Sequence, residues 1–197
     1  HNDKSSCWVR VAQSGASGGF GSILIPRVGD EVVVVFLDGN PDRPLIMGSL
    51  YNSQNMPPWS LPANKTQSGF LTRSIKGKGS NANFFRFEDK TGAEQISLHA
   101  ERNLDTEIEA DESHMVGGNR EIKVDGKHTE TIKLETSIAV TEGSYYVTVD
   151  SGEVKINAAT SITLQVGASK LVMKADGTIT LSGVTVDVTG STKVNLN

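Results

Sequence analysis

Four histidines are the residues of this chain best suited to hold a metal ion, because a neutral imidazole nitrogen is a common metal ligand. They are His1, His99, His114 and His128. We expect His99 and His114 to be surface or loop residues. His128 shares its parity with Val124 and Ile132, so in an extended strand these side chains lie on one face. A lone histidine is a poor metal site, so this candidate requires copies of the chain to meet at His128.

Other patterns suggest less chemistry. The glycine-rich stretch Gly15–Gly21 superficially resembles a phosphate-binding loop. Such a loop leads into a helix, whereas Ser22-Ile-Leu-Ile25 has the composition of a strand, so we do not expect nucleotide binding. Acidic residues are plentiful, but no pair of them stands in a context that suggests an enclosed cleft. We therefore expect no enzymatic activity and no cofactor.

Composition and charge exclude further classes of function. The chain has 197 residues, one cysteine and a formal net charge of −4. The single cysteine rules out an intrachain disulfide framework, and the negative balance argues against nucleic-acid binding through a general basic field. No apolar run is long enough for a membrane-spanning helix. Six acids between residues 101 and 112, against one base, are expected to form a solvated face.

The N-terminal part predicts a small β-barrel. Short apolar runs with many β-branched residues, separated by clear turn signals, indicate four or five strands in residues 1–52. The predicted strands are Cys7–Val11, Ser22–Ile25, Glu31–Leu37 and Pro44–Met47. Asp38-Gly39 is typical of a tight turn that needs positive φ angles.

The composition then changes twice. Residues 53–83 are polar and contain Pro57-Pro58 and Pro62, so they are predicted to be a linker or loop. Asn83–Asp89 predicts a strand, and residues 84–197 are expected to form the neck and shaft of one elongated element. Apolar residues alternate with polar ones from Ile96 onward, which favours strand over helix.

Beyond Gly118 the alternation repeats about every eight residues. Each unit contains one short strand with an apolar face, followed by a glycine-rich or polar corner. The first apolar residues of the units are Val124, Ile132, Val140, Val147, Val154, Ile162, Leu171, Ile179, Val186 and Val194.

A unit of about eight residues is too short to close a solenoid coil within one chain. An antiparallel meander is the main alternative, but two-residue hairpin signals are sparse and a second packed layer is missing. Three copies wound about a common axis would bury every apolar face, so we expect an obligate homotrimer. In such a trimer three His128 side chains could converge on the axis and hold a metal ion or an anion.

Long motifs in the first half resemble a known family. Pro26-Arg27-Val28-Gly29-x-Glu31-Val32 and Gly39-Asn-Pro-Asp-Arg-Pro44 closely resemble the spike signature of the VgrG proteins. Phe87-Glu-Asp-Lys-Thr-Gly-x-Glu94 and Ala100-Glu-Arg-Asn-Leu104 are similar to the next segment of that family. The resemblance covers nearly the whole chain.

The resemblance implies an all-β fold, in which an oligonucleotide/oligosaccharide-binding (OB) type β-barrel precedes an intertwined trimeric three-stranded β-helix needle. VgrG is the trimeric spike at the tip of the bacterial type VI secretion machine, similar to the central spike of contractile phage tails. It is assembled in the cytoplasm and delivered outside the cell or into a target cell, with transient contact to the target membrane. Because the chain begins at His1, we expect a fragment that lacks the hub through which the family joins the tube protein.

The family also implies a binding site at the C-terminal end. A tip-capping protein or effectors would bind at Val194, Asn195, Leu196 and Asn197. Two other functions remain open at this point. The chain could be the central spike of a phage-like tail, or a docking module for secreted effectors with no puncturing role of its own.

Overall fold

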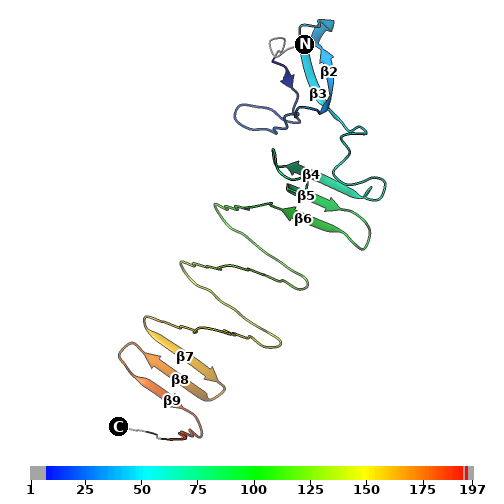
Figure 1. The fold of residues 1–197 in the computed structure, drawn as a ribbon. Coiled ribbons are helices and arrows are strands. Elements are labelled where there is room, and N and C mark those ends of the chain that lie inside the picture. Colours follow the sequence, from blue (N-terminus) through cyan, green and yellow to red (C-terminus); the bar gives the residue numbers. More distant parts are fainter. Residues whose placement is uncertain (1–7, 193, 195–197) are drawn as a thin grey trace. The chain divides into compact units, whose positions relative to one another are not determined.

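The computed structural model describes residues 8–192 and Val194, and these fall into two units. The first unit ends at Gly118 and the second begins at Asn119. Within the described residues, all regular elements are strands except η2 (Leu37–Gly39), a single turn of 3-10 helix (Figure 1). None of the described residues belongs to a helix that is long and apolar enough to cross a membrane.

The first sheet joins β1 (Arg10–Val11), β3 (Pro44–Leu50) and β2 (Glu31–Phe36) in that order. β1 runs parallel to β3, and β2 pairs with β3 antiparallel with an irregularity between Val33 and Val34. The connection between β2 and β3 contains the predicted positive φ angles, 55° at Asp38 and 70° at Gly39. Arg43 and Asp38 form an ion pair of 2.5 Å across this turn.

The prediction of a strand at Ser22–Ile25 is wrong. These residues are extended, but their main chain joins no sheet ladder. Instead, the Gln13 side chain takes the place of a neighbouring strand: its Nε2 donates to the Leu24 carbonyl at 3.2 Å, and its Oε1 accepts from the Leu24 N–H at 2.9 Å. A side chain satisfies the polar backbone groups that a second strand would otherwise pair.

The second sheet is the antiparallel meander β4 (Gln67–Arg73), β5 (Ala82–Glu88) and β6 (Gln95–His99). β5 confirms the strand predicted at Asn83–Asp89. β4 lies inside the 53–83 segment that the sequence predicted to be linker or loop. Its residues, QSGFLTR, are mostly polar, and they form a strand because all seven pair with β5.

The third sheet lies in the second unit and is another antiparallel meander, β7 (Ser161–Val166), β8 (Ser169–Lys174) and β9 (Ile179–Ser182). Its two turns contain Gly167 and Gly177 at φ angles of 55° and 86°. Such angles are easily adopted by glycine. The antiparallel meander, which was the main alternative that the sequence allowed, is therefore present, but only over residues 161–182 of the repeat region.

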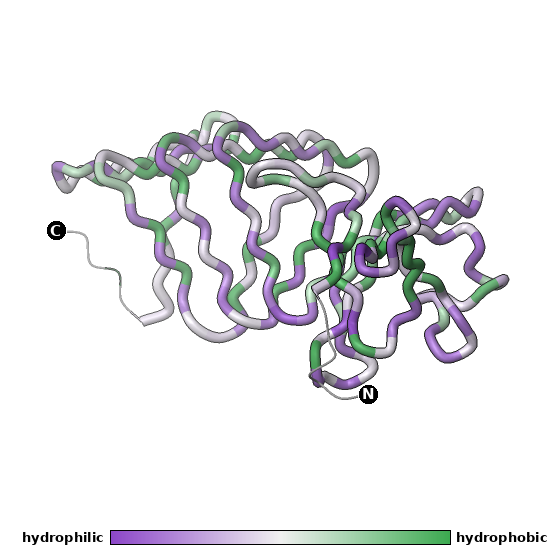
Figure 2. Tube along the Cα trace, turned by 90° about the horizontal axis from the view of Figure 1, so that it is seen from above, coloured by the Kyte–Doolittle hydropathy of each residue, from purple (hydrophilic) through white to green (hydrophobic). Residues whose placement is uncertain are grey.

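The described residues contain almost no core. Ala82, 6% exposed, is the one buried hydrophobic residue among them. Every residue from Glu101 to Ser161 is exposed. Along the extended passes of the chain, hydrophobic and hydrophilic residues alternate (Figure 2). One chain thus presents apolar faces that it does not cover itself.

Candidate functional site

The main functional feature is an extended segment without in-chain partners. Residues 102–118 of the first unit and 119–159 of the second contain no strand, and within their units no backbone–backbone hydrogen bond is formed by any of these described residues. In Figure 1 the second unit starts as a zigzag of extended passes. Backbone N–H and C=O groups are obligatory hydrogen-bonding groups. The segment therefore offers a long run of such groups to other strands.

The apolar side chains of this segment are open to solvent in the single chain. Val124, Ile132 and Val140 are 47%, 48% and 47% exposed, although each begins a unit of the repeat. Fully burying a Val, Leu or Ile side chain contributes about 1.5–3 kcal/mol. An unpaired backbone and an uncovered apolar face on the same residues together favour association with further chains.

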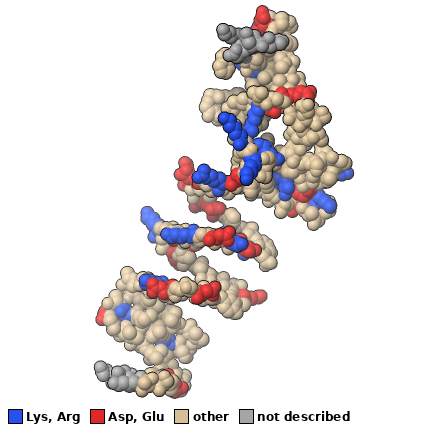
Figure 3. Space-filling model, viewed as in Figure 1, with Lys and Arg blue, Asp and Glu red and all other residues tan. Residues whose placement is uncertain are grey.

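Ion pairs between residues two apart lie on the face opposite to these apolar side chains. Lys123 and Asp125 lie 3.6 Å apart on either side of Val124, and Lys155 and Glu153 lie 2.5 Å apart on either side of Val154. Residues two apart in an extended chain point the same way, so the charges lie on the face opposite to the valines. Acidic and basic side chains are interspersed along the visible passes (Figure 3). This is the composition of a solvated outer surface.

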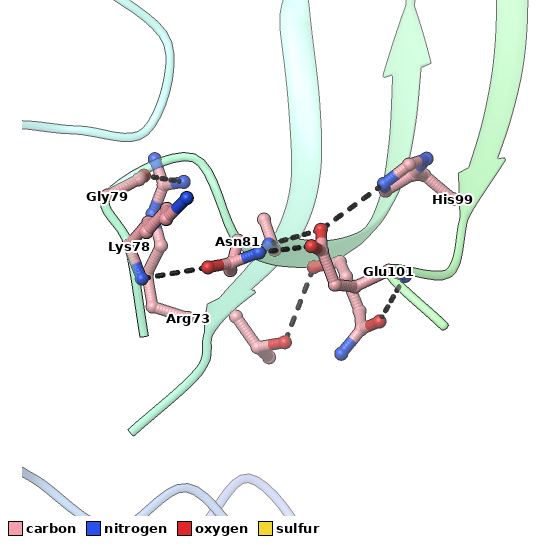
Figure 4. Close-up of polar contacts among 9 residues, drawn as sticks. Arg73, Lys78, Gly79, Asn81, His99 and Glu101 are labelled. Carbon is pink, nitrogen blue, oxygen red and sulfur yellow. Dashed lines mark hydrogen bonds and ion pairs between the residues drawn. The ribbon is translucent and has the colours of Figure 1, made fainter. Parts of the chain in front are cut away.

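A polar cluster stands where the extended segment begins. The Glu101 Oε2 atom accepts the Ala82 N–H at 3.3 Å, and its Oε1 accepts from the Asn81 side-chain amide (Figure 4). The Glu101 N–H donates to Asn83 Oδ1 at 2.9 Å. The chain is thereby fastened to the start of β5 just after it leaves β6. Glu101 was predicted to be part of a solvated acidic face, and nothing in that charge run distinguished it from its neighbours.

Side-chain hydrogen bonds also stabilise the β4–β5 turn beside this cluster. Asn81 Oδ1 accepts the Lys78 N–H at 2.8 Å, and Arg73 donates to the Gly79 carbonyl at 2.6 Å. Asn81 thus contacts both the turn and Glu101. The cluster has a structural role, because the Glu101 carboxylate already accepts hydrogen bonds from donors of the same chain.

His99, His114 and His128 have different surroundings, and His1 lies outside the described residues. His99 stacks on Phe84 with ring centroids 5.0 Å apart, and its Nε2 lies 4.0 Å from Glu101 Oε2. His114 lies 3.2 Å from the Glu112 carboxylate. His128 is exposed in the unpaired segment. Within the described part of a single chain, no three His, Cys, Asp or Glu residues gather to hold a metal ion. An ion at His128 would thus need other chains.

The C-terminal candidates are only partly described. Val194 is 43% exposed. Asn195, Leu196 and Asn197 lie outside the described residues.

Among the described residues, two carboxylates have lowered pKa values. A hydrogen bond from the Thr66 hydroxyl, 2.5 Å away, is the largest cause of the lowered pKa of Glu88, and Gln67 adds a second donor at 3.0 Å. The pKa of Asp176 is lowered chiefly by hydrogen bonds from Thr178, whose N–H lies 2.9 Å from Asp176 Oδ1. Both carboxylates stabilise connections next to strands, one before β4 and one in the β8–β9 turn.

Comparison with known families identifies two regions. The family model of the type VI secretion system/phage-baseplate injector OB domain matches residues 1–51. The model of the bacteriophage T4 gp5 C-terminal trimerisation domain matches residues 68–181, more than half of the chain. The second match includes the whole unpaired segment, residues 102–159, and implies a homotrimer.

Curated relatives agree with these matches. The type VI secretion system spike protein VgrG1a of Pseudomonas aeruginosa is 42% identical over 206 aligned residues, which cover 100% of this chain and 32% of the relative. VgrG1c of the same organism is 56% identical over 126 residues, covering 63% of this chain and 17% of the relative. The actin cross-linking toxin VgrG1 of Vibrio cholerae is 41% identical over 158 residues, covering 80% and 14%. The chain spans a third or less of the length of these relatives.

Proposed function

Because the chain belongs to the VgrG spike proteins of the type VI secretion system, we propose that three copies of it assemble into the needle that pierces a target membrane. Residues 102–159 carry this proposal. They present backbone groups without in-chain partners together with an uncovered apolar face. In a trimer each chain supplies the missing strands of the other two, and the apolar side chains meet at the axis.

The mechanical role follows from this mode of assembly. A chain whose strands pair with two partners cannot leave without breaking backbone hydrogen bonds and exposing apolar surface on both of them. The needle is therefore stiff and slow to dissociate, which suits a part that is driven through a membrane. The charged outer face keeps the needle soluble before and after this step. No catalytic step is assigned to the chain.

We propose the same partners for this chain as for the VgrG family. A tip-capping protein or effectors bind at the C-terminal end, around Val194–Asn197. The tube protein joins the spike through a hub, as in that family. The spike is assembled in the cytoplasm and delivered by the apparatus to the outside or into the target cell.

Mass and resistance to detergent test the assembly. Light scattering at micromolar concentration should give about 63 kDa, three times the 21.0 kDa of one chain. The band on an unboiled SDS gel should migrate as the trimer, and boiling should convert it to the monomer. A 21 kDa species in solution, or melting near 45 °C, would contradict the proposal.

A truncation distinguishes puncturing from the second candidate function, which is docking of effectors without puncturing. Removing residues 190–197 in the full-length protein of a secreting strain leaves the trimer intact and abolishes secretion of cargo if the end only docks partners. A puncturing needle predicts, in addition, that target-cell killing by a separately supplied effector falls. If both secretion and killing are unchanged, the C-terminal end takes part in neither docking nor puncturing. A phage-like central spike would instead be found on assembled tail particles.

A further inference from the structure

Opposite charges are segregated along the first unit. Residues 43–87 contain six bases and no acid, whereas residues 88–112 contain nine acids and two bases. The two neighbouring segments thus carry formal charges of +6 and −7. Among the described residues, none of the ion pairs joins one segment to the other. In the single chain, therefore, the two charges do not neutralise each other by direct contact.

The bases are most closely spaced on the β4–β5 turn, where Arg73, Lys76 and Lys78 are all exposed. These three cations are here called the basic turn. Within the described part of the chain, none of them forms an ion pair. The turn has a fixed shape, because Asn81 accepts the Lys78 N–H at 2.8 Å and also donates to Glu101 (Figure 4). It therefore presents its cations at a defined place beside Glu101.

The acids that follow belong to the segment without in-chain partners. Glu109 and Asp111 are exposed, and neither forms an ion pair within the described part of the chain. In an extended chain they lie on the face opposite to Ile108, so they stay outside when the apolar face is covered. A homotrimer brings three such acidic segments to the same level. Their mutual repulsion favours a position next to cations.

The repeat of eight residues indicates which cations these are. Ile108 and Val116 stand sixteen and eight residues before Val124, so the repeat extends back into the first unit. Eight extended residues span about 26 Å, close to the about 23 Å of the seven-residue strand β5. One repeat thus crosses one side of a three-sided needle. Glu101 is fastened at the basic turn of its own chain, and Glu109, one repeat later, reaches the equivalent corner of the next copy.

We propose that Glu109 of each copy contacts the basic turn of the neighbouring copy, with Lys78 as its main partner. The inference rests on the proposed homotrimer and deepens it, because it names a charged contact between copies on the outer surface. A second copy is the occupant because it supplies the complementary charge at the required spacing. One repeat beyond Glu109 stands Gly117, so copies shifted by one repeat lose the contact.

The contact acts on assembly more than on stability. Exposed ion pairs contribute little to stability, but complementary charges speed the encounter of partners and disfavour wrong arrangements. The ion pair between Glu109 and Lys78 thus guides the copies into their register. The apolar side chains then stabilise the assembled needle.

Zero-length cross-linking tests the contact directly in the trimeric protein. A water-soluble carbodiimide joins Lys78 Nζ to the Glu109 carboxylate as an amide, and the reagent takes up the water that is lost and becomes a urea. We expect two-chain and three-chain bands on a boiled denaturing gel, and a linked peptide containing Lys78 and Glu109 in them. Lys78→Gln should remove this peptide. Lys90→Gln, at an exposed lysine at the other end of the sheet, should retain it.

Two results of this experiment would overturn the inference while leaving the homotrimer standing. In one, the trimeric protein gives no link between the basic turn and Glu109. In the other, that link comes only from single-chain bands, which would show that the acidic segment folds back on its own chain. A monomeric mass for the parent protein would instead refute the homotrimer itself.

Exchanging the two charges tests the role in assembly. At 0.1 M salt, Lys78→Glu and Glu109→Lys should each form trimer from the unfolded chain at least five times more slowly than the parent, as followed by light scattering. The double variant should recover the parent rate within twofold. Lys90→Glu makes the same change of net charge and should assemble at the parent rate. At 1 M salt, where the Debye length is about 3 Å, all rates should agree. A double variant as slow as Lys78→Glu would overturn the inference.

An anionic membrane is the competing occupant, because clustered lysines also attract acidic lipids. The trimeric protein is therefore sedimented with vesicles of phosphatidylglycerol. Binding that is lost in Lys78→Gln, in a parent protein that gives no link between chains, would assign the basic turn to lipid and overturn the inference. A link between chains without vesicle binding supports it.

Discussion

Glu101 accepts the backbone N–H of Ala82 at 3.3 Å, nineteen residues earlier in the chain. The same carboxylate accepts from the Asn81 side chain, and the Glu101 N–H returns a hydrogen bond to Asn83. Ala82 is the buried residue at the start of β5. These hydrogen bonds anchor the chain to the sheet β4–β6 just after β6 ends. Beyond this point the chain continues without in-chain partner strands.

Replacing this carboxylate should loosen the sheet β4–β6. We expect Glu101→Ala to lower the free energy of unfolding by about 1–2 kcal/mol per chain, because a buried N–H loses a charged acceptor. Hydrogen exchange at the Ala82 amide should accelerate. Glu107→Ala, a change of an exposed acid in the same run, is the control and should alter neither quantity. Equal effects of the two variants would show that Glu101 acts only through its charge.

A charge on the apolar face of the unpaired segment should prevent assembly. We expect Ile132→Asp to shift the mass from about 63 kDa toward the 21.0 kDa of one chain. If the trimer formed, the introduced carboxylates of the three chains would meet without partners in an apolar interior, which costs several kcal/mol. Thr131→Asp places the same charge on the opposite face and should remain trimeric. If both variants stay trimeric by light scattering, Ile132 does not face the axis.

Acid should weaken the β8–β9 turn. The pKa of Asp176 in the folded chain is lowered from its ordinary value of 3.8 by hydrogen bonds from Thr178. Its contribution to stability is therefore complete above that pH and is lost as the pH falls through the lowered pKa. We expect the melting temperature to fall on acidification below about pH 4, and to fall less in Asp176→Asn. Asp187→Asn, at an exposed acid outside the sheet, should retain the full decrease.

Glu88 should behave in the same way in the first unit. Hydrogen bonds, the largest from Thr66, lower the pKa of Glu88 from its ordinary value of 4.5. Stability from this carboxylate is present above that pH and disappears as the pH falls through the lowered pKa. Thr66→Val should therefore reduce both the stability at neutral pH and its loss in acid. A variant that lowers stability equally at pH 7 and pH 3 would exclude this linkage.

The proposed axial position of His128 leads to a test of metal content. We propose that, in a trimer, the parity that His128 shares with Val124 and Ile132 brings three imidazoles toward the axis, where they hold a metal ion or an anion. We expect about one transition-metal ion per purified trimer, lost in His128→Ala while the trimer persists. Less than a tenth of an equivalent per trimer in the parent protein would end the proposal of a metal site.

Much of the local structure was determined by the sequence alone. Alternating apolar and polar residues predicted extended structure and the face on which each side chain lies, because successive residues of a strand point to opposite sides. Asp38-Gly39 predicted a turn with positive φ, and the structure has it. The need for three chains also followed from the sequence, since a unit of eight residues with one apolar face cannot cover itself.

Only the tertiary structure decided which strand pairs with which. The same alternation occurs at Val124 and Ile132, which have no in-chain partner strand, and at Ile162 and Leu164, which lie in a self-paired sheet. The apolar run Ile23–Ile25 also predicted a strand, but Leu24 is paired by the Gln13 side chain instead of a strand. The pattern determines the face of a side chain, but ladder hydrogen bonds join backbone groups that every residue carries. Partner choice therefore depends on contacts far apart in the chain, or in other chains, which periodicity does not encode.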